Sequence, residues 1–274
     1  MEKSSKQAVT ALRGYTKFRI LRDMIEVVKT KAVFSKDYII MILDDVTTRI
    51  LEQTCSFYEL LEAKVYQIEN LYLGRKRYKQ TDALYFISPT DESLKRLIND
   101  FSKDDRIQYE SVHLCFAGHI SDDQLKRISM CKNLTKRLRN FQEINLQFYF
   151  FEDNIFTLNK PEAFYLFNTD LSDTKTTEYL NHLSYSLFTV WTILLEKPHI
   201  IYQSDSRYSN IVAKTVNDYL NLFYDKFKEI EKRDKFRNPR AKLIILDRSF
   251  DLIAPSQHDI SYHSLVYDTK VSFI

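Results

Sequence analysis

The sequence predicts an α/β protein in which a parallel sheet flanked by helices forms a first domain and an incomplete second α/β domain follows. Short apolar runs alternate with longer amphipathic segments along most of the chain. Such alternation favours β-α-β units with helices on both faces of a parallel sheet. In addition, the apolar run at 38–43 ends abruptly at Asp44 and Asp45, which is typical of a buried parallel strand.

The first domain is expected to contain a long amphipathic helix followed by alternating strands and helices. Apolar side chains at helical spacing predict a helix over 8–30. Strands are expected at 38–43, 65–68, 83–87, 111–117 and 144–150, and helices at 48–64, from Ser88 to about Phe101, and from Ser121 to about Asn140. Ser88 before a proline is a typical helix N-cap, and Ser121 with Gln124 has the spacing of a capping box.

A second domain is expected to begin near Glu152. Helical periodicity predicts helices at 175–195 and 207–227, and apolar runs predict strands at 200–203 and 243–246. A charged, proline-containing link at 228–242 joins the last helix to the last strand. The expected organisation is therefore a first domain at 1–151, the first part of a second domain at 152–253, and a helical region beginning at 254–274.

Composition argues against several functional classes. The 274 residues include 3 glycines, all isolated, so neither common phosphate-binding loop can form. The 3 cysteines show no CxxC spacing, which predicts no zinc site, no disulfide framework and a reducing compartment. A net charge of +3 is weak for a nucleic-acid binder. The longest apolar stretch, 183–195, is shorter than the roughly 20 residues that span a bilayer.

A spaced motif near the carboxyl end resembles a family signature. Residues 243–268 read LIILDRSFDLIAPSQHDISYHSLVYD. The matching positions are Leu246, Asp247, Arg248, Asp251, Pro255, His258, Tyr262 and Asp268. This pattern is similar to that of the SM proteins, the Sec/Munc-type regulators of SNARE-driven membrane fusion. Segments 39–51, 83–101 and 143–151 also resemble the family, so the resemblance covers nearly the whole chain.

The resemblance implies a non-catalytic protein that binds a syntaxin-like SNARE and SNARE complexes. It implies no cofactor, no metal and no nucleic-acid partner. The protein would be cytoplasmic and would reach membranes peripherally, through its SNARE partners. Residues 254–274 would begin a third, helical domain, and chains of this family continue well beyond this point.

The resemblance also implies a charged syntaxin-binding face on the first domain. The expected residues are Asp44, Arg49, Glu69, Lys76 and Arg77. Arginine suits such a face because its planar fork matches carboxylates. The alternative is a local ion pair between Asp44 and Arg49 that only orders the loop. Ser56 stands where a family relative carries a lysine, so partner choice need not transfer.

The basic run Arg75, Lys76, Arg77 and Lys79 has several interpretations. It could meet acidic residues of a SNARE, anionic lipid or nucleic acid. The plain alternative is a solvated loop. A second expected site is a shallow pocket for an amino-terminal syntaxin peptide, formed by Leu125, Ile128, Leu138 and Glu143. The alternative there is that the three apolar residues face the core.

The signature itself leaves an enzymatic alternative open. Two acids and a histidine after a strand, Asp247, Asp251 and His258, could be metal ligands or acid–base groups of a metal-dependent hydrolase or phosphotransferase. The family resemblance instead implies a structural role for Asp247, Arg248, Asp251, Pro255, His258 and Tyr262. No GxSxG or HExxH motif occurs.

Overall fold

The computed structural model describes residues 11–34, 38–102, 107–168, 173–227, 240–258, 261–262 and 264–266. The chain divides into two compact units. Unit 1 comprises Met1–Asp170 with Ser186–Leu195, and unit 2 comprises Leu171–Tyr185 with Glu196–Ile274. The expected domain boundaries at 151 and 253 stay predictions.

Unit 1 is built on a parallel sheet of five strands in the order β2-β1-β3-β4-β5. The strands are β1 (Ile39–Leu43), β2 (Val65–Asn70), β3 (Tyr78–Ile87), β4 (Tyr109–Phe116) and β5 (Leu138–Glu143). All four pairings are parallel, which confirms the predicted architecture. All five residues of β1 are buried, because both faces of the sheet are covered.

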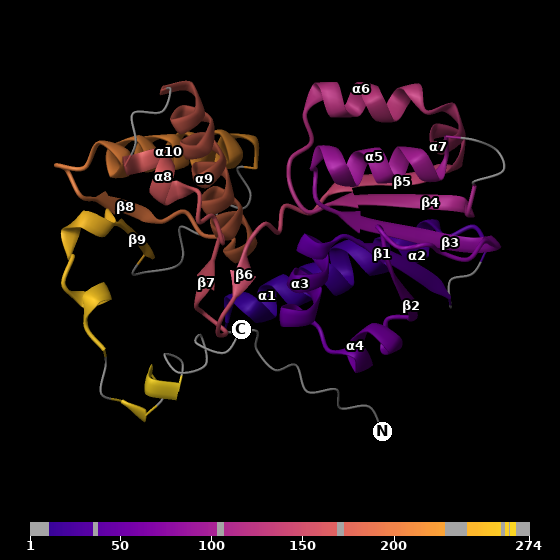
Figure 1. Cartoon of the computed structure of the whole chain (residues 1–274), viewed down its shortest axis with the longest axis horizontal. Coiled ribbons are helices and arrows are strands. Elements are labelled where there is room, and N and C mark those ends of the chain that lie inside the picture. Colours follow the sequence, from indigo (N-terminus) through magenta and orange to yellow (C-terminus); the bar gives the residue numbers. More distant parts are fainter. Residues whose placement is uncertain are drawn as a thin grey trace. The chain divides into compact units, whose positions relative to one another are not determined.

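Helices cover both faces of this sheet (Figure 1). One face carries α5 (Asp91–Asp100), α6 (Asp122–Met130) and α7 (Lys132–Arg137). The other carries α1 (Leu12–Phe18), a π-helical segment η1 (Arg19–Glu26), α2 (Val27–Lys31), α3 (Asp45–Thr54) and α4 (Phe57–Glu62). Each face has its own apolar cluster, so the sheet separates two cores.

Two helix boundaries differ from the expectation. The predicted helix 48–64 is two helices, because Cys55 ends α3 in an extended conformation and Ser56 begins α4 with a capping box to Glu59. The N-cap of α5 is Thr90, not Ser88. The Ser88 amide instead donates a hydrogen bond to the side chain of Asp44, directly after β1. Asp44 is distant in the sequence, and only folding brings it close to Ser88.

The predicted fifth strand at 144–150 is wrong. The fifth strand is β5, which ends at Glu143, and Asn145 then adopts a left-handed φ of 57° that interrupts extended structure. Ile144, Leu146 and Phe148 are nevertheless buried, so their alternation imitates a strand without joining the sheet. The segment ends in β6 (Tyr149–Phe150), which pairs antiparallel with β7 (Phe156–Thr157).

The remaining predicted helices and strands occur in the expected order, together with one helix, at 163–168, that the sequence analysis did not predict. Unit 1 also contains α8 (Ala163–Asn168), and α9 (Asp173–Leu194) contributes its first part to unit 2 and its second part to unit 1. Unit 2 has β8 (His199–Tyr202), α10 (Arg207–Lys226) and β9 (Lys242–Ile245), with the two strands parallel. Two short 3-10 helices, η3 (Arg248–Phe250) and η4 (Ala254–Ser256), follow.

One face of the β8–β9 pair is open. Ile201 and Ile244 are register partners, and they are 47% and 59% exposed. Most of the expected link, residues 228–239, and the motif position Asp268 lie outside the described residues. Among the described helices, none combines the length and apolarity needed to cross a bilayer.

Candidate partner-binding site

Asp44 is the structural anchor at the carboxyl edge of the unit 1 sheet. Its side chain accepts hydrogen bonds from the Thr47 amide at 2.9 Å, which caps α3. Its other oxygen, Oδ2, accepts from the amide and hydroxyl of Ser88 at 2.7 and 2.5 Å and from the Ser93 hydroxyl at 2.8 Å. Asp44 is 1% exposed, which corrects the expectation that it lies on a contact face.

The network around Asp44 joins several segments. The Thr47 hydroxyl also donates to the carbonyl oxygen of Phe86 at 2.7 Å, at the end of β3. Ser93 receives a hydrogen bond from the Thr90 hydroxyl and lies 3.1 Å from the Tyr72 hydroxyl. The loops after β1, β2 and β3 are therefore fixed to one another, and this crest (residues 43–49, 70–72 and 86–93) is a rigid platform.

Arg49 stands exposed on this crest, one helical turn beyond Asp44. Among the described residues it forms no ion pair, so the alternative of an Asp44–Arg49 pair is not what the structure shows. Arg49 lies near Tyr149 of β6, whose pKa is raised by burial and by the Asp44 charge against the opposing effect of Arg49. Sequence analysis missed Tyr149 because it placed this residue in a sheet strand.

Glu69 is an internal acceptor on the edge strand β2. One carboxylate oxygen accepts from the Gln67 amide nitrogen at 2.7 Å, and the other accepts from the Tyr109 hydroxyl. Burial and this hydrogen bond raise the pKa of Tyr109, which keeps its hydroxyl a donor. Glu69 is only partly exposed, and both of its oxygens are engaged within unit 1.

The basic run is divided between the interior and the surface. The Arg75 side chain is 4% exposed and pairs with Asp100 at 2.5 Å, with its guanidinium 5.9 Å from the ring centre of Tyr85. This burial contradicts the interpretation of the run as a wholly solvated loop. Lys76 and Arg77 are exposed and form no ion pair among the described residues. The side chain of Lys79 lies outside the description.

The structure does not bring all five expected charged residues together. Lys76 and Arg77 lead into Tyr78, which pairs with Tyr109 at the start of β4. They therefore lie at the amino edge of the parallel sheet, whereas Arg49 lies at the carboxyl edge. Of the five, only Arg49 is exposed at the crest, with Asp44 buried beneath it.

The expected peptide pocket falls on the α6 side of the sheet. Leu125 is 38% exposed, Ile128 is buried and Leu138 is half-buried. Ile128 and Leu138 belong to the core cluster on this face, in agreement with the alternative that these apolar residues face the core. Glu143 accepts from the Ile120 amide at 3.0 Å and contacts His119. Phe141, 37% exposed on β5, was missed by the sequence analysis.

The signature acids hold turns in unit 2. The Asp247 carboxylate accepts from the amide and hydroxyl of Ser249 and from the Ser206 hydroxyl, and the Ser249 bonds lower its pKa. Asp251 accepts from the amides of Ile253 and Ala254, which lower its pKa. These bonds fit the structural role of the motif.

The other signature residues add no metal centre. Arg248 donates to the carbonyl oxygen of Asp251 at 2.6 Å, Pro255 lies in η4, and Tyr262 is 85% exposed. His258 follows η4 in the described part of unit 2. Within the residues that the structure describes, no group of three His, Cys, Asp or Glu side chains could hold a metal ion.

Comparison with known proteins agrees with this architecture. The Sec1 family model matches residues 39–271. The chain is 31% identical over 260 residues to protein transport protein sec1 of Dictyostelium discoideum, covering 94% of this chain and 42% of that protein. It is 25% identical over 264 residues to the SNARE-interacting protein KEULE of Arabidopsis thaliana, covering 93% and 39%.

Two solved structures share the fold. The Unc18–syntaxin 1 complex from Monosiga brevicollis matches with a TM-score of 0.75 and 24% identity, over 92% of this chain and 42% of that chain. Sly1p in complex with an N-terminal peptide of Sed5p matches with a TM-score of 0.73 and 19% identity, over 92% and 44%. The chain spans less than half the length of these relatives. The chain belongs to the Sec1 family.

Proposed function

We propose that this protein binds a syntaxin-like SNARE and regulates vesicle docking and membrane fusion without catalysing a reaction. The observation that carries the proposal is the Sec1 family match over residues 39–271. It is supported by the similarity to an Unc18 protein solved with syntaxin 1 and to Sly1p solved with a Sed5p peptide. The protein would work in the cytoplasm and reach membranes through its partner.

The crest of unit 1 is the proposed contact surface. Arg49 is exposed there without an ion-pair partner among the described residues, so it can bind a carboxylate of a partner at little desolvation cost. Asp44 would not touch the partner itself. It accepts hydrogen bonds from Thr47, Ser88 and Ser93, and these bonds fix the loop and helix that present Arg49. Lys76 and Arg77 would contact only a partner that extends to the opposite edge.

A second proposed contact is the α6–β5 surface, where an amino-terminal SNARE peptide would bind. Leu125 and Phe141 offer exposed apolar area, and the Glu143 carboxylate ends β5 and holds the Ile120 amide just before α6. This combination suits a peptide with one basic group and one apolar anchor. Ile128 and Leu138 would form the floor.

The mechanism would be differential affinity. A protein that binds one conformation of a SNARE more tightly raises the population of that conformation by the ratio of the two affinities. Binding a closed syntaxin would delay pairing, and binding an assembling bundle would favour it. No covalent bond has to change in either case.

Calorimetric titration with the cytosolic part of a syntaxin-like SNARE tests the crest. Arg49→Glu should weaken binding about tenfold, because it replaces an attraction by a repulsion. The matched control is Lys136→Glu, since Lys136 is also exposed but lies on α7, away from both proposed contact surfaces. Equal affinity of Arg49→Glu and wild type, with unchanged circular dichroism, would remove the crest from the proposal.

The peptide surface can be tested separately. Leu125→Arg should abolish binding of the isolated amino-terminal SNARE peptide. The substitution removes an exposed apolar side chain and adds a positive charge that repels the basic group of the peptide. The same variant should bind the remaining cytosolic SNARE as wild type does. Loss of both interactions would mean that the two surfaces are one, and loss of neither would exclude the α6–β5 surface.

A further inference from the structure

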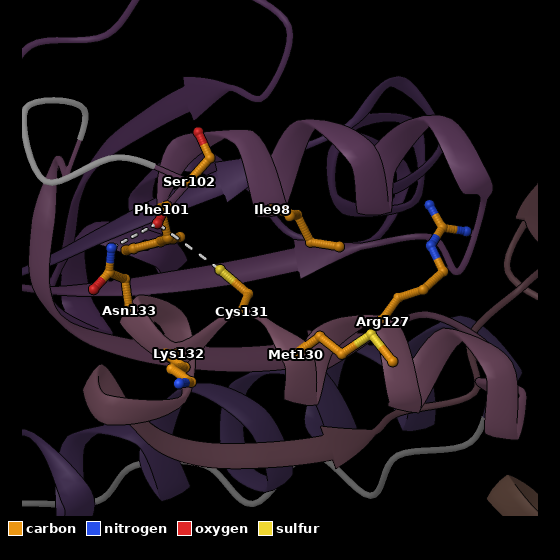
Figure 2. Close-up of a pocket in the computed structure, with 8 residues that line it drawn as sticks. All are labelled: Ile98, Phe101, Ser102, Arg127, Met130, Cys131, Lys132 and Asn133. Atoms are coloured by element: carbon orange, nitrogen blue, oxygen red, sulfur yellow. Dashed lines mark hydrogen bonds between the residues drawn. The ribbon is translucent and has the colours of Figure 1, made fainter.

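A hollow separates α5 from α6 and α7 on the outer face of unit 1. Its volume is about 510 Å³, within the range of sites that take a side chain or small ligand. Its lining comes from the end of α5, from α6 and from the start of α7: Ile98, Phe101, Ser102, Arg127, Met130, Cys131, Lys132 and Asn133. Figure 2 shows Cys131 and Asn133 both joined to the carbonyl oxygen of Phe101.

The hollow is held open by polar ties at its two ends. At one end Arg127 of α6 pairs with Asp91 in the first turn of α5. At the other end Asn133 donates to the carbonyl oxygen of Phe101 at 3.1 Å. These ties fix the separation of the helices, so an occupant would not have to open the groove. An adjoining hollow of about 870 Å³ continues along α5 and shares Ile98, Ser102 and Arg127.

The lining combines an apolar floor with surplus positive charge. Ile98 and Phe101 form the α5 side, and Met130 on α6 is 77% exposed, which is unusual for so large an apolar side chain. Lys95 and Lys132 border the two hollows and form no ion pair among the described residues. The charge of Asp91 is met by Arg127, which leaves Glu92 as the unpaired acid of the lining.

We propose that this groove, between α5 and α6–α7, binds a short acidic peptide segment of a protein partner. One aliphatic or aromatic side chain would lie between Ile98 and Met130, and flanking carboxylates would reach Lys95 and Lys132. The groove is separate from the α6–β5 surface, because Leu125 points from a different side of α6 and Glu143 gives that surface the opposite charge. The proposal does not depend on SNARE binding at either surface described above.

Peptide titration of the whole chain tests this proposal. The probe is a fluorescein-labelled peptide with one leucine between runs of glutamate, and the comparison peptide carries lysine in place of glutamate. The acidic peptide should bind and the lysine peptide should not. Lys95→Glu and Lys132→Glu should each weaken binding roughly fivefold, the size of one exposed charge pair lost. Lys136→Glu, an exposed lysine of α7 outside the lining, is the matched control.

Alkylation of Cys131 by iodoacetamide gives an independent readout of where the peptide sits. Cys131 lines the hollow, so bound acidic peptide should slow its alkylation in wild type and in Lys136→Glu, whereas Lys95→Glu should need about five times more peptide for the same protection. Equal binding of both peptides, equal affinity of all variants, or no protection of Cys131 would each overturn the proposal. Binding to vesicles rich in phosphatidylserine, lost in the same two variants without any peptide binding, would also overturn it.

Discussion

Asp44 and Ser88 join the ends of two neighbouring strands of the unit 1 sheet. The amide and the hydroxyl of Ser88, directly after β3, both donate to Oδ2 of the aspartate that follows β1. The same oxygen accepts from Ser93 in the first turn of α5. Both oxygens of this buried carboxylate accept hydrogen bonds, from segments far apart in the chain, so the shape of the crest depends on it.

Removing the charge of Asp44 should therefore destabilise unit 1. Asp44→Asn loses charge-assisted hydrogen bonds and places an amide group against the Ser88 amide, which should cost about 3 kcal/mol of unfolding free energy. Urea unfolding followed by fluorescence of Trp191, the single tryptophan and part of unit 1, measures this. Asp45→Asn, at the exposed neighbouring position, should change it by less than about 0.5 kcal/mol.

Adjacent residues of the basic run should behave differently. Arg75→Met leaves the Asp100 carboxylate buried without its cation, which should cost about 3 kcal/mol. Lys76→Met changes an exposed side chain without an ion pair among the described residues and should be nearly neutral. The same urea experiment compares them. Equal stability of the two variants would contradict the buried position of Arg75.

Asp82 fixes the loop before β1 and gives a pH-dependent test. Its carboxylate accepts from the amides of Val33 and Phe34 at 3.0 and 2.8 Å and from His113 at 3.2 Å. Burial acts to raise the pKa of Asp82, but the bonds from His113, Ser111 and the two amides outweigh it and lower the pKa.

Because this pKa is lower in the folded than in the unfolded chain, the ionised Asp82 stabilises the fold above its unfolded value near 3.9. The stabilisation is lost as pH falls below about 4. Asp82→Asn should therefore be about 2 kcal/mol less stable than wild type between pH 5 and 8, and this difference should shrink in acid. A stability difference between Asp82→Asn and wild type that grows as pH falls would contradict this prediction. Faster hydrogen exchange at Val33 and Phe34 in the variant would locate the effect.

The three cysteines should differ in reactivity. Burial raises the pKa of Cys55 and of Cys115 to about 12, so neither thiol provides much thiolate at neutral pH. Cys131 is only partly buried and lines the α5–α6 groove. Iodoacetamide at pH 8 should modify Cys131 alone in the folded chain and all three in urea, as read by mass spectrometry. Modification of Cys115 without urea would contradict the burial of its side chain in the core that β4 shares with α1–α4.

A divalent metal should leave unit 2 unchanged. Both oxygens of Asp247 and one oxygen of Asp251 already accept hydrogen bonds from turn amides and hydroxyls, which competes with metal coordination. Magnesium or manganese should not shift the melting temperature, whereas Asp247→Ala should lower stability by about 1 kcal/mol through loss of the Ser249 cap. A metal-induced shift that Asp247→Asn removes would instead favour the hydrolase or phosphotransferase hypothesis.

The parallel architecture was predictable because strands buried on both faces leave apolar runs, and crossover helices leave 3.6-residue periodicity between them. The fifth strand was misplaced for the same physical reason. Ile144, Leu146 and Phe148 alternate into the core as strand residues do, but the left-handed Asn145 keeps them out of the hydrogen-bonded ladder. Burial pattern reports packing and not pairing.

The sequence indicated where the charged residues lie on the sheet but not which of them are buried. The sequence placed Asp44 and Arg49 after the first strand, and the structure has them at the carboxyl edge of the sheet, but their role in partner binding stays a prediction. Which of the two is buried depends on Ser88 and Ser93, which lie 44 and 49 residues away in the chain. In the same way, Arg75 differs from Lys76 only through Asp100, 25 residues distant. Local sequence contains no record of such tertiary partners.

The inward Asp44 and the outward Arg49 separate the shape of the crest from its surface charge. A substitution at Arg49 leaves the hydrogen bonds of Asp44 intact, whereas one at Asp44 removes the bonds that join Thr47, Ser88 and Ser93. The charge that the crest presents to solvent can therefore change while its backbone stays the same.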